Sequence, residues 1–375
     1  MIKKRFHYID GILLLICCCL FLFACSTENK NNEAPGEEQE QTSNNGNQEL
    51  ASLDIDYRLF QKVVGWLDNE TLLVHIGDSE TQQLVTFDIF TGNINQIYSV
   101  DSFILTVELN QAKNKILLQE IKNEQTSFKI VTSEGNLIQS TEFEFASYVN
   151  FHWNPLSNNT VFVSHYSFDP ESETETINVY NWDIENDSFS RKKIPSLSPK
   201  WYTENIYLYV DEMNDGGLYI GDIRKDKQDM MINQDISNFY INQDTFIGLV
   251  ESDITENEVL LFHEYPFLLG DKVISIPKVT MNDKPIKLNF TQSTRNGKIY
   301  GVIPNQSFVV EEELGSYHLS RLNFQKEARH DILELPENAP IALSPDEEHL
   351  LYGWRLENIV DLSDPELIEL LEILN

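Results

Sequence analysis

The feature that most constrains this chain is a weak internal repeat that begins at residue 51. Each copy reads as a strand, a short polar turn and a second strand with alternating apolar side chains. Seven segments share this pattern, and they span residues 65–75, 105–119, 153–163, 200–210, 240–250, 290–302 and 342–354. Their second strands begin at Leu72, Ile116, Val161, Ile206, Phe246, Ile299 and Leu350. These starts follow one another at spacings of about 40 to 53 residues, which indicates one structural unit repeated along the chain.

The length of the repeat and its strand content predict a β-propeller, whose blades hold four short strands each. In the first unit two further strands follow, at residues 82–90 and 93–100, and in the fourth at 217–223 and, less clearly, 229–233. We therefore expect an all-β fold, a single propeller of six or seven four-stranded blades over residues 51–375. The count of hairpins gives seven. A β-sandwich is the alternative, but a core of more than about 300 residues is too large for one sandwich.

The two ends of the repeat region suggest how such a ring closes. Residues 53–60 predict an outer strand for the last unit, whose third strand is predicted at 358–362. Residues 363–375 predict a short C-terminal helix, because Ser363 and Glu366 form a capping box. Its apolar stripe consists of Leu367, Leu370, Leu371 and Leu374. We expect this helix to pack on the propeller, with partner binding as the alternative.

The N-terminus carries the pattern of a processing signal. Basic residues 3–5 precede an apolar run at 11–23, which is too short to span a bilayer. The run ends in Leu-Phe-Ala-Cys at residues 22–25, which resembles the lipobox of bacterial lipoproteins. The resemblance implies that residues 1–24 are a signal peptide and that Cys25 receives a diacylglyceryl group. The mature protein would then sit on the outer face of the bacterial cytoplasmic membrane, and an uncleaved membrane anchor is the alternative.

The segment after the signal has the composition of a tether. The three other cysteines, at 17–19, fall within the signal, so no disulfide, catalytic thiolate or cysteine metal site is expected in the mature domain. Residues 25–50 are rich in Asn, Glu, Gln and Ser and nearly devoid of apolar side chains. We expect a lipidated, disordered tether with a reach of about 25 to 30 Å.

The charge of the chain excludes one class of partner. The sequence holds 27 Lys and Arg against 60 Asp and Glu, a formal net charge of −33. Such a chain repels a phosphate backbone, so a nucleic-acid binder is not expected. Apolar residues make up 41% of the sequence, enough for a large core, so global disorder is excluded as well.

Two of the repeated hairpins resemble a known motif. The segments ALSPDEEHLLYGW (342–354) and WNPLSNNTVFV (153–163) are similar to degenerate copies of the SPDG hairpin of TolB-like and WD40-like propellers. Together with the lipobox, the tether and the acidic repeat, they make the chain resemble the YqgU-like propeller lipoproteins of Gram-positive bacteria. That family is described as six-bladed, whereas the hairpins here number seven. The resemblance implies no catalytic residue.

Motifs for catalysis are sparse. The sequence contains no G-x-S-x-G elbow, no P-loop and no G-x-G-x-x-G, and its histidines lack zinc-site spacing. His165 and Asp169 lie close together in a predicted long loop, and His152 lies on a predicted inner strand near the central tunnel. Structural roles are favoured for both histidines. Three aromatic residues of predicted inner strands are candidates either for a pocket wall or for packing between blades: Trp153, Trp201 and Tyr240.

Acidic residues concentrate in one class of loop. In a propeller the loops that join second to third strands all emerge on one face, and here these loops are strongly acidic. The candidate residues for a partner or cation face are Asp169, Glu171, Glu173, Asp211, Glu212, Asp215, Glu251, Asp253 and Glu256. Clustered hard oxygens suit Ca²⁺. Neither the acids at 211–215 nor those at 251–256 follow the residue order of a calcium loop. No other cofactor is predicted. The alternative is that these acids serve solubility alone.

Three classes of function remain. The favoured one is a non-enzymatic binding or scaffold module of the cell envelope, held to the membrane by its lipid and docking a basic protein or divalent cations. The second is an envelope glycan or peptidoglycan hydrolase or lyase, which needs two carboxylates and a histidine together near the tunnel. The third is a solute-binding or sensor lipoprotein with an aromatic-lined pocket. Fold alone does not decide among them.

Overall fold

The computed structural model describes residues 49–371 except 145–147, 171–172, 214–215, 226–227, 243–244 and 264–271. Contacts divide the chain into two units, Met1–Gln48 and Glu49–Asn375. The predicted signal peptide, the lipidated Cys25 and nearly all of the tether lie outside the described residues, so they stay predictions. Within the part that is described, no helix is long and apolar enough to cross a membrane.

All seven predicted hairpins form, and each opens a four-stranded antiparallel sheet. The first three sheets are β1 (Phe60–Trp66), β2 (Thr71–Gly77), β3 (Gln82–Asp88), β4 (Ile94–Val100); β5 (Phe103–Leu109), β6 (Lys115–Lys122), β7 (Gln125–Thr132), β8 (Leu137–Phe143); and β9 (Asn150–Asn154), β10 (Ser157–Asp169), β11 (Thr174–Asp183), β12 (Ser188–Lys192). The next two are β13 (Lys200–Trp201), β14 (Ile206–Val210), β15 (Leu218–Asp222), β16 (Met230–Asn233); and β17 (Ile236–Asn242), β18 (Thr245–Glu251), β19 (Glu258–His263), β20 (Val273–Pro277). The last two are β23 (Phe290–Gln292), β24 (Ile299–Pro304), β26 (Tyr317–Asn323), β27 (Ala328–Leu335); and β28 (Ile341–Leu343), β29 (His349–Tyr352), β30 (Asn358–Asp361), β31 (Leu367–Glu369). A 3₁₀ helix, η1 (Phe324–Lys326), joins β26 to β27.

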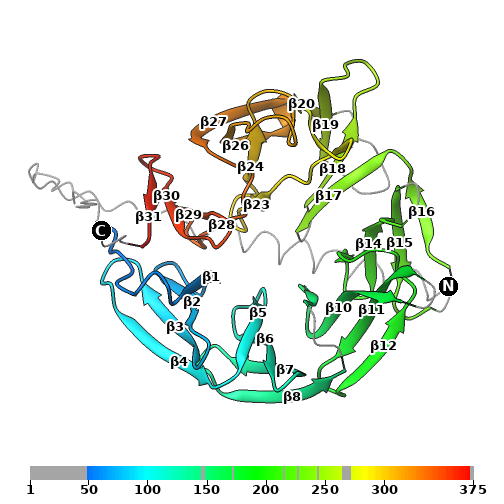
Figure 1. Ribbon diagram of the computed structural model, residues 1–375. Coiled ribbons are helices and arrows are strands. Elements are labelled where there is room, and N and C mark those ends of the chain that lie inside the picture. Colours follow the sequence, from blue (N-terminus) through cyan, green and yellow to red (C-terminus); the bar gives the residue numbers. More distant parts are fainter. Residues whose placement is uncertain are drawn as a thin grey trace, which may run out of the picture. The chain divides into compact units, whose positions relative to one another are not determined.

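The sheets are arranged as the blades of a propeller, with the first strand of each blade nearest the common centre (Figure 1). Neighbouring inner strands contact one another, β1 with β5, β9 with β13 and β23 with β28. The second strand of a blade is covered on both sides by adjacent blades, which explains its nearly continuous apolar run. In β2, for example, Leu72, Leu73 and Val74 are all fully buried. The fold prediction is confirmed, and the described residues hold seven four-stranded sheets.

The ring closes differently from the prediction. Residues 53–60 form no outer strand, and Leu53 makes a single parallel bridge to Leu371. The outer strand of the last blade is β31, which lies in the segment predicted as a helix. The helix prediction is therefore wrong for residues 363–371, while residues 372–375 lie outside the described part. Pairing with β30 outweighs the helical spacing of the leucines, because it satisfies the backbone and still buries Leu370 and Leu371.

Contacts between the first and last blades seal this junction. The amide of Leu53 donates to the carbonyl of Leu370 at 2.6 Å, and the amide of Val63 donates to that of Arg355 at 2.9 Å. The indole Nε1 of Trp66 donates to the carbonyl of Ala342 at 3.0 Å. Trp66 is only 3% exposed and belongs to a core cluster that both blades share. The first and last blades are thus joined mainly by packing and by scattered hydrogen bonds.

A small sheet that the repeat does not predict lies beside the sixth blade. It consists of β22 (Lys284–Pro285), β21 (Val279–Met281) and β25 (Phe308–Val309), and β21 pairs with β25 in parallel. β21 and β22 come from the connection between the fifth and sixth blades, and β25 comes from the loop between β24 and β26. The connection falls within the widest spacing of the repeat, between Phe246 and Ile299.

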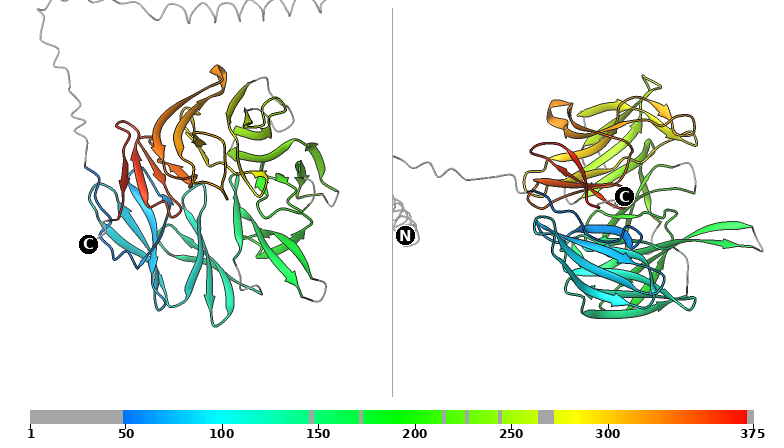
Figure 2. Two further views of the ribbon diagram at one scale, coloured as in Figure 1. Left: turned by 45° about the horizontal axis from the view of Figure 1, so that its top comes forward. Right: turned by 60° about the vertical axis from the view of Figure 1, so that its left-hand side comes forward.

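The propeller has two faces, named here by the segments that form them. The loop face carries the described parts of the loops between second and third strands, at 78–81, 123–124, 170, 173, 211–213, 216–217, 252–257, 305–316 and 353–357, with the small sheet and the connections between blades. The turn face carries the described turns between first and second strands, at 67–70, 110–114, 155–156, 202–205, 293–298 and 344–348, and those between third and fourth strands. The hairpin of β10 and β11 is the longest and extends beyond the other sheets (Figure 2).

Candidate functional site

An apolar cavity of about 720 Å³ opens on the loop face at the sixth and seventh blades. The small sheet forms part of its wall, through Met281 and Phe308, and Trp354 from the loop of the seventh blade forms another part. Two large apolar side chains at its rim are exposed to solvent: Leu314 fully and Trp354 to 63%. Exposed apolar groups gathered around a cavity mark a surface that binds something.

Charged side chains of both signs lie in this cavity. Glu313 and Glu337 belong to its lining together with Lys284 and Lys287, and the neighbouring Glu311 and Glu312 are exposed on the same loop as Glu313. The indole Nε1 of Trp354 donates to Oε2 of Glu337 at 2.5 Å, which fixes the ring at the rim. The cavity therefore combines an apolar interior with an acidic border.

A second cavity, of about 540 Å³, gathers three of the predicted acids. Asp211, Glu212 and Glu251 line it, together with Asp235 and Lys284. Each of the three already has a partner: Glu212 accepts from Ser196 Oγ at 2.7 Å, and Asp211 accepts from the amide of Met213 at 3.0 Å. Glu251 forms an ion pair with Lys278.

The other predicted acids are dispersed. Asp253 and Glu256 are exposed in the loop between β18 and β19, and Glu173 is exposed immediately before β11. Asp169 ends β10, where its backbone pairs with Thr174. Glu171 and Asp215 lie outside the described residues. Within the described ranges, no group of three or more His, Cys, Asp or Glu residues is placed to hold a metal ion.

A cluster of charged side chains occupies the centre of the ring. Its members are Lys62 on β1, Glu108 on β5, His152 on β9, Lys200 on β13 and Lys287 in the segment before β23. Four of them come from the first strands of four blades, which lie nearest the common centre, and Lys287 comes from the connection before the sixth blade; electrostatic interactions connect the five (Figure 1). We call these five residues the axis cluster.

Hydrogen bonds fix the positions of the axis cluster. The ammonium of Lys62 donates to the carbonyl of Val107 at 3.0 Å, directly beside Glu108. The indole of Trp201 donates to the carbonyl of His152 at 3.2 Å, which holds β13 and its Lys200 against β9. These bonds tie β1 to β5 and β13 to β9.

Burial changes the protonation of the axis cluster. It lowers the pKa of Lys200 to about 7, an effect increased by the charge of Lys287 and opposed by Glu108. It also lowers the pKa of Lys287 and places that of His152 well below its usual range, so the imidazole is neutral. The pKa of Glu108 is raised by burial, although Lys62 and Lys200 act to lower it. Lys62, Glu108, His152 and Lys200 are partly exposed to solvent, and Lys287 is exposed.

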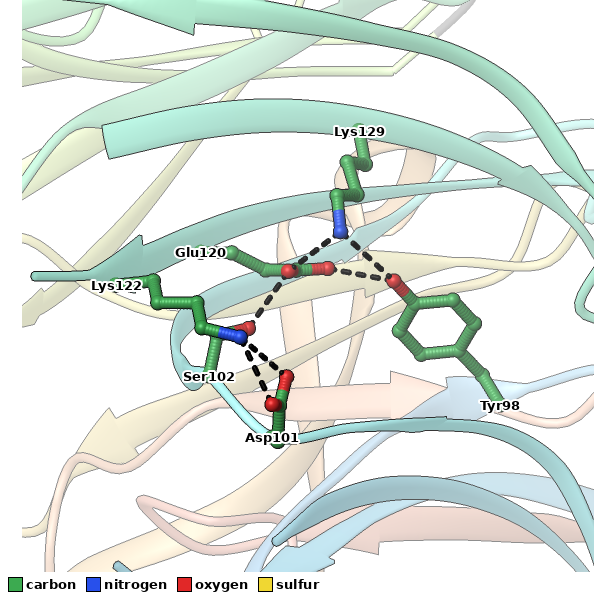
Figure 3. Close-up of polar contacts among 6 residues, drawn as sticks. All are labelled: Tyr98, Asp101, Ser102, Glu120, Lys122 and Lys129. Carbon is green, nitrogen blue, oxygen red and sulfur yellow. Dashed lines mark hydrogen bonds and ion pairs between the residues drawn. The ribbon is translucent and has the colours of Figure 1, made fainter. Parts of the chain in front are cut away.

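A buried carboxylate elsewhere shows what full pairing looks like. Glu120, only 2% exposed, accepts hydrogen bonds from Tyr98 Oη at 2.6 Å, Ser102 Oγ at 2.7 Å and Lys129 Nζ at 2.7 Å (Figure 3). This group joins the outer strand of the first blade to the second blade. In contrast, Glu108, Lys200 and Lys287 form no ion pair within the part of the chain that the structure describes.

The remaining predicted residues take structural positions. His165 and Asp169 lie on β10, so the long loop predicted there is wrong: the segment pairs with β11 over its whole length. Nδ1 of His165 lies 3.1 Å from the carbonyl of Tyr166, and its ring stacks on Tyr180. Trp201 stacks on Phe162 at 4.1 Å between ring centroids.

The two other aromatic candidates also serve packing. Trp153 is buried in the core cluster of the second and third blades, and Tyr240 contacts Phe290 between the fifth and sixth. These positions confirm blade packing rather than a pocket wall for the inner-strand aromatics.

Of the axis cluster, sequence reasoning singled out only His152. The signal for the others is present in the repeat: Lys62, Glu108, His152 and Lys200 recur at about the period of the blades, each on a predicted first strand or next to one. A polar residue at the same place in successive units predicts a shared position at the axis. The apolar cavity had no such signal, because its walls come from the small sheet.

Comparison with known proteins places this architecture. The model of the YqgU-like 6-bladed beta propeller domain matches residues 88–353. The chain belongs to this family. The match begins at the end of β3 and ends after β29, so it covers five of the seven sheets completely and the first and last in part. The family's description names six blades, whereas the described residues of this member form seven four-stranded sheets.

One relative and one solved structure are similar to this chain over most of its length. The chain is 24% identical over 330 residues to the uncharacterized lipoprotein YqgU of Bacillus subtilis (strain 168), which covers 82% of this chain and 83% of the relative. This family member's propeller is also similar to the crystal structure of an uncharacterized protein from Listeria monocytogenes EGD-e. The TM-score is 0.76 at 19% identity, covering 86% of this chain and 98% of the other.

The fold extends to enzymes at lower similarity. An oligogalacturonate lyase from Vibrio parahaemolyticus has a TM-score of 0.57 at 11% identity, covering 81% of this chain and 88% of the lyase. At these identities the likeness shows the propeller fold alone. The family therefore includes a lipoprotein, and the fold is that of a propeller.

Proposed function

We propose that this protein is a lipid-anchored binding module of the cell envelope, which docks a basic protein segment with an apolar anchor on its loop face. The observation that carries the proposal is the apolar cavity with its acidic border. Buried in a complex, Trp354 and Leu314 would supply the apolar contacts, and aromatic anchors of this kind dominate binding energy at interfaces.

The charge of the border selects the partner. Glu313 and Glu337 line the cavity and Glu311 and Glu312 lie next to Glu313, and none of the four forms an ion pair with a lysine or arginine of the described residues, although Lys284 and Lys287 also belong to the lining. Like charges gathered at a rim attract a partner of opposite sign and speed its association at low salt. A basic segment therefore fits this border, whereas an acidic or nucleic-acid partner does not.

The location follows from the N-terminus. The lipobox-like residues 22–25 and the name of the Bacillus relative both support lipidation at Cys25. Two acyl chains give stable attachment, and the tether lets the propeller stand away from the membrane. We expect Cys25→Ala to move the protein from the membrane fraction to the soluble fraction and to abolish labelling by a radioactive fatty acid. Retention in the membrane with labelling intact would contradict lipidation at this residue.

The docking face is tested by site-specific photo-crosslinking of the full chain in its own cells. A photoreactive phenylalanine analogue replaces Leu314 on the loop face and, as the matched control, Leu156, which is 60% exposed on the turn face. We expect a discrete adduct from position 314, absent from position 156. Mass spectrometry of the adduct should identify a segment rich in Lys or Arg.

Charge variants complete this test. With Glu311, Glu312 and Glu313 all changed to Gln, the adduct at position 314 should fall at least about tenfold, because the electrostatic attraction is lost. An adduct at both positions, an adduct with an acidic segment, or an adduct unaffected by the charge variants would each overturn the proposal.

A hydrolase is not favoured by the geometry. That hypothesis requires two carboxylates and a histidine together near the axis, and the axis cluster joins His152 to one carboxylate, Glu108, and three lysines.

A further inference from the structure

We propose that the axis cluster is a binding site for a phosphate dianion, either free phosphate or the terminal phosphate of a monoester. The site is separate from the docking face of the proposed function and does not depend on it. Its walls are the inner strands β1, β5, β9 and β13 and the segment before β23.

The first argument is an imbalance of charge. Lys62, Lys200 and Lys287 bring three amines to the axis, against the carboxylate of Glu108 and that of Glu212, which interacts with Lys287. The protein as a whole is strongly acidic, so this accumulation of amines is local and opposite in sign to the whole. A phosphate monoester carries about −1.5 to −2 charges at pH 7 and attracts such a group of amines.

The second argument is the lack of internal partners. Lys200 is partly buried, and an ammonium group withdrawn from water is costly unless it is paired, whereas Lys287 is exposed. Lys62 reaches a carbonyl oxygen, but neither Lys200 nor Lys287 forms an ion pair with any residue that the structure describes. Nδ1 of His152 is also buried and has no hydrogen-bond partner among the described residues. An oxyanion with several acceptor oxygens would satisfy both the ammonium groups and this ring.

The type of cation supports phosphate over a planar carboxylate. All three cationic groups are lysines, which bind as point charges with donors in any direction, and such groups suit the tetrahedral oxygens of phosphate. Arginine, whose fork pairs with carboxylates in two parallel hydrogen bonds, is absent from the cluster.

Access is available from the loop face. Lys287 belongs both to the axis cluster and to the wall of the apolar cavity, so the cluster lies next to that opening. The remainder of a phosphate ester can extend toward this opening while its phosphate stays at the axis.

Binding should also capture a proton. Because the pKa of Lys200 is about 7, this amine is only partly protonated at neutral pH when the site is empty, with Glu108 as the nearby counter-charge and Lys62, Lys287 and His152 facing it from the other strands. A dianion at the axis favours the ammonium form, so phosphate binding takes up protons from the buffer.

The test is calorimetric titration of the full chain in detergent with inorganic phosphate at pH 7.5 and low salt. We expect saturable binding of one phosphate per chain, with an apparent enthalpy that depends on the buffer because protons are taken up. Glycerol 3-phosphate should bind as well if the natural ligand is a monoester, and binding of phosphate alone would identify the free ion. Dimethyl phosphate, a monoanionic diester, should bind at least about tenfold more weakly.

Two variants that change the charge of the site in opposite directions separate an effect on binding from an effect on folding. Lys200→Gln should weaken phosphate binding at least about tenfold, whereas Glu108→Gln should strengthen it by a similar factor, because the first removes a positive charge and the second a negative one. Lys298→Gln, an exposed lysine on the turn face, is the control and should change affinity less than about twofold. No saturable binding to the natural chain, or weaker binding to the Glu108→Gln variant, would overturn the proposal.

Discussion

The turn face and the loop face are built from the same seven repeats but differ in how the blades meet. On the turn face, side chains of one turn bond to the next blade: Asn110 Nδ2 donates to Asn158 Oδ1 at 3.2 Å, and Asn154 Nδ2 donates to the carbonyl of Glu204 at 2.8 Å. Gln111 even reaches Asn242 of the fifth blade at 3.4 Å. The loop face instead holds the two cavities, the small sheet and the exposed Trp354.

This difference teaches that one repeat can separate two tasks. Short turns leave few conformations to order, and their polar side chains satisfy one another, so the turn face holds the ring together. Longer loops can vary without disturbing the blades, so the loop face is free to bind. Substitutions on the turn face should therefore lower stability, and substitutions on the loop face should alter binding.

Two tryptophans give the largest expected contrast. Trp66 is 3% exposed between the first and last blades, and Trp66→Ala should lower the free energy of unfolding by about 3–5 kcal/mol. Trp354 is mostly exposed on the loop face, and Trp354→Ala should cost less than about 1 kcal/mol while removing the crosslink at Leu314. Chemical denaturation of both variants measures this contrast. Equal losses of stability in the two variants would contradict the assignment of stability to one region and binding to the loop face.

Two glycines with nearly the same backbone angle test packing alone. Gly135, on the turn face, has φ of +83°, and Gly216, on the loop face, has φ of +86°. A Cβ at Gly135 would fall onto the backbone carbonyl of Ile97, whereas a Cβ at Gly216 meets no atom within 4 Å. Gly135→Ala should cost about 3 kcal/mol or more, and Gly216→Ala about 1 kcal/mol from backbone strain. Similar thermal midpoints for the two variants would show that strain, not packing, dominates.

Two turn-capping residues sharpen the comparison at a smaller scale. Asn110 is buried, and its Oδ1 accepts from the amides of Asn114 and Lys115 while its amide group bonds to Asn158. Asn110→Ala should cost about 1–3 kcal/mol, because buried polar groups lose their partners. Asp78 caps an exposed loop-face turn through two amides, and Asp78→Ala should cost about 0.5–1 kcal/mol. Urea titrations of the two variants measure both losses of stability. The loss from Asn110→Ala must exceed the loss from Asp78→Ala for the comparison to hold.

The axis cluster should make the stability of the protein depend on pH. The unfolded chain keeps the Lys200 proton up to its ordinary pKa of 10.5, whereas the folded chain releases it near pH 7. Between these values the folded state holds fewer protons, so stability rises with pH across this window. His152 and Lys287, whose pKa values are also lowered, act in the same direction, and Glu108, whose pKa is raised, acts oppositely at lower pH.

The variant Lys200→Met isolates this contribution. Its free energy of unfolding should rise less between pH 7 and pH 9.5 than that of the natural chain, since the titrating amine is gone. Lys298→Met, exposed on the turn face, should follow the natural curve. Parallel curves for all three proteins would contradict a desolvated ammonium at Lys200.

Much of the fold follows from local pattern. Alternating strands and polar turns placed all seven hairpins correctly, because a strand between two blades needs apolar side chains and its turn needs residues that tolerate tight backbone angles. The prediction for the C-terminal segment rested on the same kind of local pattern, and it was wrong. Its leucines at 367, 370 and 371 fit a helical stripe, but residues 367–369 pair with the open edge of β30 as a strand, and Leu370 and Leu371 follow this strand.

The candidate site was predictable only in part. The acids of the loop face could be assigned to their loops, yet the apolar cavity requires the small sheet, whose parallel pairing of Val279 with Phe308 joins segments far apart in the chain. Likewise His165 was placed in a loop because β10 is longer than the other strands, and no local signal gives that length.

The repeat, the strand order within each blade, the acidic surface and the lipobox-like N-terminus can be read from the sequence, since each of these depends on neighbouring residues and on composition. How the ring closes, where the cavities open and which charges meet at the axis become visible only in the folded chain. The physical reason is that closure and the axis are contacts between blades: Lys62 and Lys287 interact with the same cluster although more than 200 residues separate them, and no local pattern encodes such a distance.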